Sequence, residues 1–375
     1  MKIKETLENL SSTGNLRQLP DDRRFDCSID FSTNDYLGLG SLTLGRMLSR
    51  HPELVETHMT SSASRLLAGV QHEYEDLEND LATLYGREAL LYNSGYHANT
   101  GTISAIADRS TIIIADRLVH ASIIDGILLS RAKLLRFDHN DLDMLESMLS
   151  DNYNSGKQIL VIVESVYSMD GDSPDMNRLV ELKQKYPSII LYVDEAHAFG
   201  VNGPKGLGLA METGHPEAFD IIVTTFGKAL GSYGACVLTT HDIKEFLVNR
   251  SRSLIFSTSL PPVSALWTKL MLDEMIRADD RRLKLKAHAE LLHKILGQYS
   301  GSVPDTPSHI RALIIGDANK TVEVSKKLRD EGIIVLPIRT PTVPAGTERL
   351  RLSLSASMQP DDILKLSKAL KCITD

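Results

Sequence analysis

Residues 189–197, IILYVDEAH, and residues 220–228, DIIVTTFGK, decide the fold that we expect for this chain. Each stretch contains a run of apolar, largely β-branched residues (189–193 and 221–223) that is followed by polar ones. Such runs are typical of strands that are buried on both faces of a parallel sheet. Open sheets of this kind bind ligands at the carboxyl ends of their strands. We therefore expect the polar residues of VDEAH and TTFGK to face one cleft.

The same alternation of apolar runs and helical patterns extends from about residue 46 to about residue 245. Residues 111–116 (TIIIAD) and 159–165 (ILVIVES) predict two more buried strands, and residues 89–101 predict a strand, a glycine turn and the start of a helix. Residues 72–86 predict a helix with one apolar face. That face carries Tyr74, Leu77, Leu81 and Leu84. The pattern predicts an α/β domain with a mostly parallel central sheet.

The pattern changes after about residue 246. One long helical pattern runs from about Val263 to Gln298. Short strands and helices follow it, and antiparallel strands with helices on one side predict a smaller α+β domain. The predicted strands are 309–316, 333–338 and 348–356. We predict an N-terminal arm (1–45), a large domain (46–250) and a small C-terminal domain (251–375).

Composition narrows the function classes. The chain has 375 residues, is 42% hydrophobic and 24% charged, and carries a net charge of −8, whereas nucleic-acid binders are usually basic. Its three cysteines are widely spaced, which indicates reduced thiols in the cytoplasm. The start, MKIKETLENL, has no apolar core of a signal peptide, and no apolar stretch approaches the ~20 residues that span a bilayer. We expect a cytoplasmic protein that binds neither nucleic acid nor membrane.

Familiar ligand motifs are missing. The GK pair at Gly227 lacks the earlier glycine and the following hydroxyl of a P-loop. There is no GxGxxG after a strand, no HExxH and no GxSxG, which argues against dinucleotide, zincin and serine-hydrolase chemistry. Residues 138–149 have spaced carboxylates but no calcium-loop glycine, so they predict a helix start. We predict no metal site.

Lys228 is the only charged side chain between Ile221 and Thr240, and glycines flank it. A lysine with few charges near it loses its proton more readily, because desolvation lowers the pKa of an amine, and a neutral amine attacks a carbonyl. The alternative is an ordinary surface lysine.

Asp194 ends an apolar run, where a carboxylate needs a partner. It either caps a following helix or pairs with the protonated ring nitrogen of pyridoxal phosphate, a partner that this cofactor requires. In the second case His197 bonds the phenolic oxygen of the cofactor.

Other residues complete a set. Ser94, Gly95 and Tyr96 lie where a strand gives way to a helix, and they form either a phosphate seat or an ordinary cap. His120 either stacks on an aromatic ring or caps a helix. Alternation in ERLRLSLSA gives one strand face that is either solvated or a fork for a substrate carboxylate. That face carries Arg349, Arg351, Ser353 and Ser355. Together these groups predict pyridoxal phosphate chemistry on amino acids.

The chain also resembles the α-oxoamine synthases, which are pyridoxal phosphate enzymes of aminotransferase fold type I. The resemblance covers residues 31 to about 357. The motifs are NDYLGLG, NSGYHANTG, DRLVHAS, ESVYSMDGD, VDEAHAFGVNG, TTFGKALG, FSTSLPP and PTVPAGTERLRLSLSA. NDYLGL and PTVPAGTxRLRL are most similar to the member that joins L-alanine to a pimeloyl thioester in biotin biosynthesis.

The resemblance implies residue roles. Lys228 would bind the cofactor and take the α-proton, Asp194 would pair with the ring nitrogen, and His197 and His120 would contact the phenolic oxygen and the ring face. Gly95, Tyr96 and Thr225 would hold the phosphate, and Ser168 would lie beside the ring. Ser257 and Thr258 would reach the phosphate of the second subunit in a homodimer. Arg351, Asn34, Arg17 and Thr342 would bind substrate.

The implied activity is a decarboxylative condensation of L-alanine with a pimeloyl thioester of coenzyme A or a carrier protein. One alternative is a sister synthase that uses glycine or serine with another acyl group. A second alternative is a non-catalytic scaffold of the same fold.

Overall fold

The computed structural model describes residues 2–17, 29–69 and 71–374. The chain divides into two compact units. The smaller unit comprises residues 1–36, 168–172 and 280–375, and the larger comprises 37–167 and 173–279. The sequence predicted divisions after residues 45 and 250, whereas the units divide after Tyr36 and Asp279. Residues 18–28 of the predicted arm lie outside the described residues.

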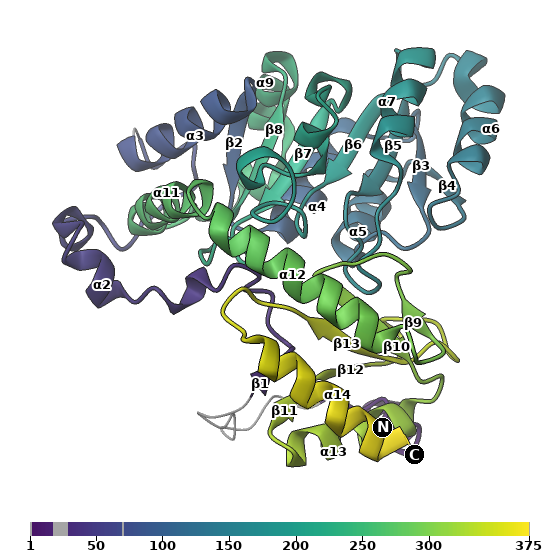
Figure 1. Cartoon of the computed structure of the whole chain (residues 1–375). Coiled ribbons are helices and arrows are strands. Elements are labelled where there is room, and N and C mark those ends of the chain that lie inside the picture. The colour runs from purple at the N-terminus through teal and green to yellow at the C-terminus, as the bar shows by residue number, and fades with distance from the viewer. Residues whose placement is uncertain (1, 18–28, 70, 375) are drawn as a thin grey trace. The chain divides into compact units, whose positions relative to one another are not determined.

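The larger unit is built on a seven-stranded sheet in the order β2–β8–β7–β6–β5–β3–β4 (Figure 1). The strands are β2 (Glu88–Tyr92), β3 (Ile112–Asp116), β4 (Lys133–Phe137), β5 (Ile159–Glu164), β6 (Ile190–Asp194), β7 (Ile221–Thr225) and β8 (Ala235–Thr239). β8 runs antiparallel to both neighbours, and the pairs from β7 across to β4 are parallel. The predicted, mostly parallel sheet is therefore confirmed.

Helices cover both faces of this sheet because the connections between parallel strands are right-handed. The connections through α4 and α5 step toward β4, and those through α6 and α7 step back toward β7, so the two pairs lie on opposite faces (Figure 1). The helices of the unit are α2 (Leu44–Leu48), α3 (His72–Tyr85), α4 (Gly95–Ile106), α5 (Ala121–Ser130), α6 (Leu142–Asn152), α7 (Met176–Lys185), α8 (Leu209–Glu212), α9 (His241–Arg250), α10 (Arg252–Ile255) and α11 (Pro262–Ile276).

One buried cluster joins the sheet to α4, α5, α9 and α10. Alternate strand residues such as Ile113, Ile162 and Val223 point into it and are fully buried. Fully burying a side chain of this size contributes ~1.5–3 kcal/mol. The cluster therefore fixes the carboxyl ends of β3, β5, β6 and β7 relative to one another.

The smaller unit has an antiparallel sheet in the order β12–β13–β10–β9 and a parallel pair, β1–β11. Its strands are β1 (Ile29–Asp30), β9 (Ser302–Val303), β10 (Ile310–Ile314), β11 (Ile333–Ile334), β12 (Leu336–Ile338) and β13 (Arg349–Ser353). Its helices are α1 (Lys2–Ser12), α12 (Asp279–Leu296), α13 (Ala318–Asp330) and α14 (Pro360–Thr374). The predicted α+β character is confirmed.

One expectation about elements was wrong, and one of two alternatives is excluded. The single helix expected from Val263 to Gln298 is two helices, because α11 ends at Ile276 and α12 begins at Asp279. The face of β13 is not solvated, because Arg349, Arg351 and Ser353 are all buried.

Among the described residues, no helix is both apolar and long enough to cross a bilayer.

The segment 168–172 is locked into the smaller unit at Gly171. This residue has φ 76°, and a Cβ added to it would lie 2.0 Å from the carbonyl oxygen of Ile310. We expect Gly171→Ala to lower the free energy of unfolding by ~1–2 kcal/mol for left-handed backbone, and by ~1–3 kcal/mol more for the clash. Urea denaturation would measure the change.

Gly346→Ala is the matched control, because Gly346 has φ 82° and a Cβ there would meet nothing within 4 Å. It should show the backbone cost alone. Equal losses in the two variants would contradict the predicted clash at Gly171.

Candidate active site

The carboxyl ends of β6 and β7 bring the central residues together. Asp194 is the last residue of β6 and pairs in register with Val223 of β7. β7 ends at Thr225, and the chain then turns through Gly227 and Lys228 before β8 begins at Ala235. Parallel strands end at one edge of a sheet, so VDEAH and TTFGK occupy the same edge, as the sequence predicted.

Lys228 and His197 are neighbours at this edge. Lys228 Nζ lies 2.9 Å from His197 Nε2, and His197 is 5% exposed. The turn that carries Lys228 is held by backbone bonds from Gly231 N–H to the Lys228 carbonyl (3.0 Å) and from Phe226 N–H to the Gly234 carbonyl (2.9 Å). The lysine is therefore fixed against a buried ring and is no ordinary surface lysine.

Asp194 is 5% exposed and does not cap a helix, since residues 196–200 form turns. The cap interpretation was therefore wrong. One carboxylate oxygen, Oδ1, accepts the backbone N–H of Ala196 (2.9 Å). The other, Oδ2, accepts the side-chain amide of Asn99 (2.8 Å). Both contacts orient a carboxylate that has nine-tenths of its surface removed from water.

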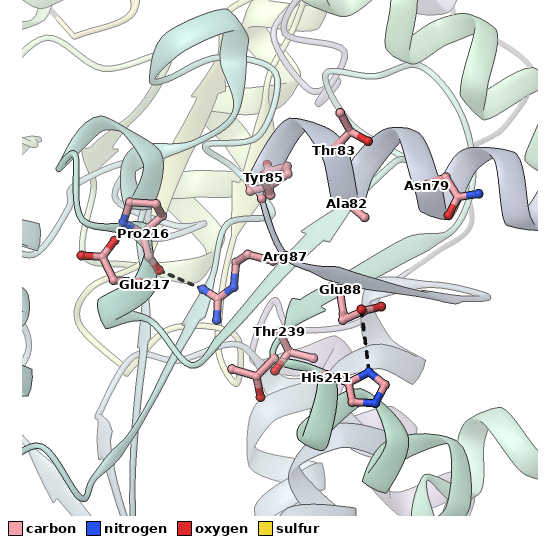
Figure 2. A pocket seen from close by; sticks show the side chains of 12 residues that line it. Asn79, Ala82, Thr83, Tyr85, Arg87, Glu88, Pro216, Glu217, Thr239 and His241 are labelled. Carbon is pink, nitrogen blue, oxygen red and sulfur yellow. Dashed lines mark hydrogen bonds and ion pairs between the residues drawn. The ribbon is translucent and has the colours of Figure 1, made fainter.

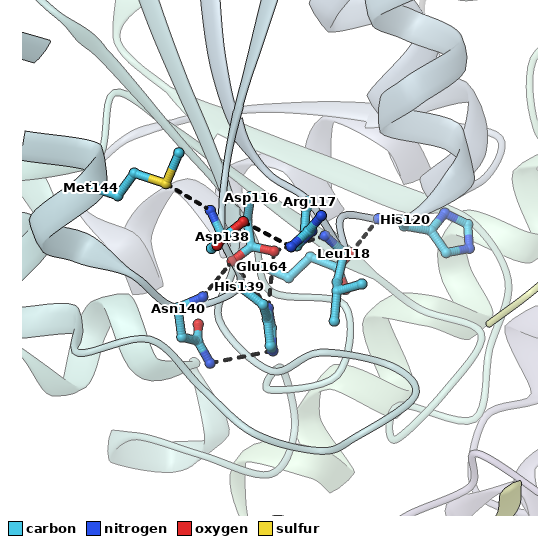
Figure 3. Close-up of polar contacts among 9 residues, drawn as sticks. All are labelled: Asp116, Arg117, Leu118, His120, Asp138, His139, Asn140, Met144 and Glu164. Atoms are coloured by element: carbon cyan, nitrogen blue, oxygen red, sulfur yellow. Dashed lines mark hydrogen bonds and ion pairs between the residues drawn. The ribbon is translucent and has the colours of Figure 1, made fainter. Parts of the chain in front are cut away.

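His120 lies at the start of α5, where its Nδ1 accepts the N–H of Ser122 (3.2 Å) and so caps the helix. Its own backbone N–H donates to the Glu164 carboxylate at the end of β5 (Figure 3). Burial, and then repulsion from the Asp194 carboxylate, raise the pKa of Glu164 well above its usual range, while Lys228 acts in the opposite direction.

The turn that leads into His120 is anchored by Asp116, the last residue of β3. Its carboxylate accepts the N–H groups of Leu118 and Asn140 (each 2.8 Å) and contacts Nδ1 of His139 (2.9 Å; Figure 3). Burial opposes ionisation of Asp116, but the contacts with His139 and the two N–H groups hold its pKa below the usual value. The position of His120 thus depends on two buried carboxyl groups, those of Asp116 and Glu164, which end the neighbouring strands β3 and β5.

The predicted phosphate residues also meet. α4 begins at Gly95, with Ser94 as its cap: Ser94 Oγ accepts the N–H of His97 (3.2 Å). A Cβ added to Gly95 would lie 3.5 Å from the Thr225 side chain, so this backbone runs directly beside that hydroxyl. The first N–H groups of a helix have no partner within the helix. Together with a neighbouring hydroxyl they suit an anion.

Ser257 and Thr258 lie in a segment that pairs with another part of the larger unit. Thr258 bridges to Ser64, and its carbonyl accepts the side-chain amide of Asn93 (2.7 Å). This places Thr258, which is exposed, next to the residue that precedes the Ser94 cap. Their expected contact with a second subunit remains a prediction.

In the smaller unit, Arg351 is 3% exposed and donates to three neutral oxygens. These are the Ser168 carbonyl (2.6 Å), the Ser353 hydroxyl (2.7 Å) and the Asn34 side-chain carbonyl (3.1 Å). Arg349 instead pairs with the Asp170 carboxylate. Of the two arginines on this face, Arg351 has no carboxylate among its direct contacts with the described residues.

Arg17 and Thr342, which the resemblance associates with substrate, contact each other. The Arg17 guanidinium donates to the Thr342 hydroxyl at 2.6 Å, and both side chains are exposed.

The aminotransferase class I and II sequence pattern matches residues 28–370. The chain belongs to the aminotransferase class I and II family. It is 43% identical over 370 residues to a provisionally named 8-amino-7-oxononanoate synthase of Pasteurella multocida, covering 96% of this chain and 95% of that one. A second relative with that provisional name, from Neisseria meningitidis, is 40% identical over 381 residues, covering 99% and 100%.

Solved structures agree with the aminotransferase fold. The chain has a TM-score of 0.89 and 28% identity to a serine palmitoyltransferase of S. paucimobilis with a bound PLP–myriocin aldimine, covering 99% of this chain and 96% of that one. It has a TM-score of 0.77 and 30% identity to an 8-amino-7-oxononanoate synthase of Francisella tularensis, covering 93% and 97%. The expected fold type I architecture is confirmed.

A groove of about 860 Å³ is lined by residues of α3, β2 and the end of β8 (Figure 2). It is lined by Glu88 and Thr239, which pair with each other, and Thr239 also pairs with Ile221 at the start of β7. The groove therefore opens at the amino-terminal end of β7.

Sequence reasoning missed three residues that contact Asp194 or His120 in the candidate site: Asn99, Ser122 and Glu164. Asn99 lies in the middle of α4, where a polar residue that is 1% exposed is unusual. Its partners come from β6 and α5, which no sequence spacing relates to α4.

Proposed function

We propose that this chain is a pyridoxal phosphate-dependent acyltransferase that condenses L-alanine with a pimeloyl thioester. The products would be 8-amino-7-oxononanoate, carbon dioxide and the free thiol, in the pathway to biotin. The observation that carries the proposal is the contact of Lys228 with His197 beside Asp194, at the ligand-binding edge of the sheet. The nearly full-length similarity to the named relatives supports this choice within the family.

The residues fit pyridoxal phosphate, the predicted cofactor, which the family and its cofactor-bound neighbours confirm. Asp194 offers a buried carboxylate to a ring nitrogen, and Lys228 offers an amine to an aldehyde. The start of α4 lies beside the Thr225 side chain, so the first N–H groups of the helix and this hydroxyl would hold the phosphate. When bound, the cofactor supplies a protonated aromatic ring that accepts the electron pair left on the amino-acid α-carbon.

The chain's own groups then perform the following tasks. Asp194 would keep the proton on the ring nitrogen, because a nearby opposite charge favours the charged form of its partner. Lys228 Nζ takes the proton from the α-carbon of L-alanine and later returns one to the product. His197 orients Nζ, and the His120 ring covers one face of the site. Ser168 would lie beside the ring.

We assign the substrate carboxylate to Arg351, with Asn34 orienting its guanidinium. A buried guanidinium whose partners among the described residues are neutral oxygens favours an incoming carboxylate, which it binds in a fork. Arg17 and Thr342, linked at 2.6 Å, would contact the acyl substrate.

Replacing Arg351 by alanine is expected to raise the KM for L-alanine ~10²-fold, since hydrogen bonds to charged groups contribute ~1.5–3 kcal/mol each. The KM of Arg351→Lys should lie between those of the native chain and Arg351→Ala, because lysine keeps the positive charge but cannot form the two parallel hydrogen bonds of a guanidinium. Steady-state kinetics with varied L-alanine would measure the change, with Arg329→Ala on the exposed face of α13 as control. An unchanged KM would remove Arg351 from the substrate site.

We also propose that the enzyme is a homodimer in which Ser257 and Thr258 contact the phosphate bound by the other copy. The exposure of Thr258 and its position next to Asn93 support this assignment.

The activity is tested by incubating the holoenzyme with L-alanine and pimeloyl-CoA and detecting the amino-ketone by mass spectrometry. A product of the expected mass, with release of one thiol per molecule, supports the proposal. A pimeloyl thioester of the carrier protein should be assayed in parallel, because the proposal does not specify which thiol carries the acyl group.

A sister synthase is the second candidate, since the serine palmitoyltransferase neighbour has a TM-score of 0.89 against 0.77 for the Francisella tularensis synthase. Product from serine or glycine with a long-chain acyl-CoA, and none from L-alanine, would favour it. Failure of every amino acid to react or to perturb the bound cofactor would favour the non-catalytic scaffold.

A further inference from the structure

One buried amide connects two functional groups of the proposed site. Asn99 Nδ2 donates to Asp194 Oδ2 (2.8 Å) and to Ser122 Oγ (2.9 Å), and Asn99 Oδ1 accepts the hydroxyl of Tyr192 (2.6 Å). Ser122 Oγ lies 2.7 Å from Nδ1 of His120. Asn99, Ser122 and Tyr192 are almost completely buried, so water cannot replace these contacts.

The donors and acceptors in this network have one consistent direction. Asp194, when ionised, only accepts, so the Asn99 group that faces it is the NH₂. The second hydrogen of that NH₂ points to Ser122 Oγ, which leaves the serine proton for His120 Nδ1. The backbone N–H of Ser122 also donates to Nδ1 (3.2 Å). Two donors therefore face one ring nitrogen, which must carry a lone pair.

We propose that Asn99 is a positioning residue that orients the Asp194 carboxylate and, through Ser122, keeps His120 neutral with its proton on Nε2. This inference rests on the proposed function, because it gives a role to the two residues that would hold and cover the cofactor ring. The Asn99 side chain would thus orient both Asp194 and His120.

The surrounding charges are consistent with this role. Desolvation lowers the pKa of His120, and Lys228 lowers it further, while Asp194 and Asp125 raise it. Glu164 faces the backbone N–H of His120 and is itself shifted toward the neutral form. A neutral ring is the better stacking surface for a cationic aromatic ring.

The first test follows histidine tautomers by NMR in ¹⁵N-histidine-labelled protein without cofactor. The His120 signal is assigned by its loss in His120→Asn. We expect unprotonated Nδ1 and protonated Nε2 at pH 7 in the native chain. In Asn99→Ala both tautomers should be present and protonation should occur at a higher pH. Because no cofactor is needed, this readout is independent of whether the proposed reaction occurs.

The second test measures cofactor affinity by titrating the apoprotein with pyridoxal phosphate and recording absorbance. Asn99→Ala should bind the cofactor about 10-fold more weakly, since Asp194 loses one charge-assisted hydrogen bond. Ser122→Ala should change the tautomer ratio of His120 and leave the affinity near that of the native chain, because the contact of Asn99 with Asp194 remains.

Asn249→Ala, on the exposed surface of α9, is the matched control. Thermal unfolding of each variant shows whether it is folded. If Asn99→Ala does not fold, the tautomer ratio of Ser122→Ala tests the proposal by itself. A proton on Nδ1 of the native His120 would overturn the proposal. So would an unchanged tautomer ratio and an unchanged affinity in folded Asn99→Ala, or an unchanged tautomer ratio in Ser122→Ala.

Discussion

Replacing Lys228 by alanine is expected to reduce kcat for product formation by more than the ~10²–10⁴-fold that a positioned general base contributes. The loss should exceed this range because the same amine binds the cofactor and moves the α-proton. His197, whose Nε2 lies 2.9 Å from Nζ, could at most replace the proton transfer and not the bond to the cofactor. Single-turnover and steady-state assays of amino-ketone formation would measure the change.

The matched control is Lys157→Ala, an exposed lysine that precedes β5. It should retain native kcat. The Lys228 variant should remain folded by circular dichroism, because the turn around it is held by backbone bonds. A Lys228→Ala variant that is folded and retains a tenth of native kcat would contradict the assigned role.

Replacing Asp194 by alanine should cause the second-largest loss. An opposite charge in contact shifts a pKa by ~1–3 units, and each unit corresponds to about 1.4 kcal/mol. Loss of the carboxylate should therefore reduce kcat by ~10–10³-fold, because less of the ring nitrogen is protonated. The change is measured as kcat together with the absorbance of the bound cofactor across pH.

Asp194→Glu should lose less kcat than Asp194→Ala, since it retains a carboxylate. Asp151→Ala, at an exposed position in α6, is the control and should retain native kcat. The sign of the pH effect is part of the test. Without Asp194 the pKa of the ring nitrogen should be lower. The loss of activity with rising pH should therefore begin at a lower pH than in the native chain. Identical pH profiles in Asp194→Ala and the native chain would contradict the ion pair.

The strands of the sheet were predictable because fully buried parallel strands have a simple signature. β3, β5, β6 and β7 are runs of β-branched residues and are buried along nearly their whole length. The break between α11 and α12 was missed because no glycine, asparagine or proline lies between Ile276 and Asp279 to mark it.

The site was only partly predictable for a similar reason. Lys228, Asp194 and His197 are next to one another because polar residues at strand ends meet at one edge. Asn99 contacts Asp194 only because α4 crosses the same face of the sheet, which depends on the order of the strands. The burial of Arg351 likewise depends on the pairing of β13 with β10 and β12, which alternation along one strand does not reveal.

The role proposed for Lys228 requires a covalent bond between its Nζ and the aldehyde carbon of pyridoxal phosphate. Borohydride reduction of the holoenzyme, followed by digestion and peptide mass spectrometry, tests it directly. We predict one pyridoxyl-phosphate adduct on the peptide that contains Lys228, and its absence after reduction of Lys228→Ala. An adduct on another lysine of the native chain, or no adduct in protein that binds the cofactor, would contradict the assignment of Lys228.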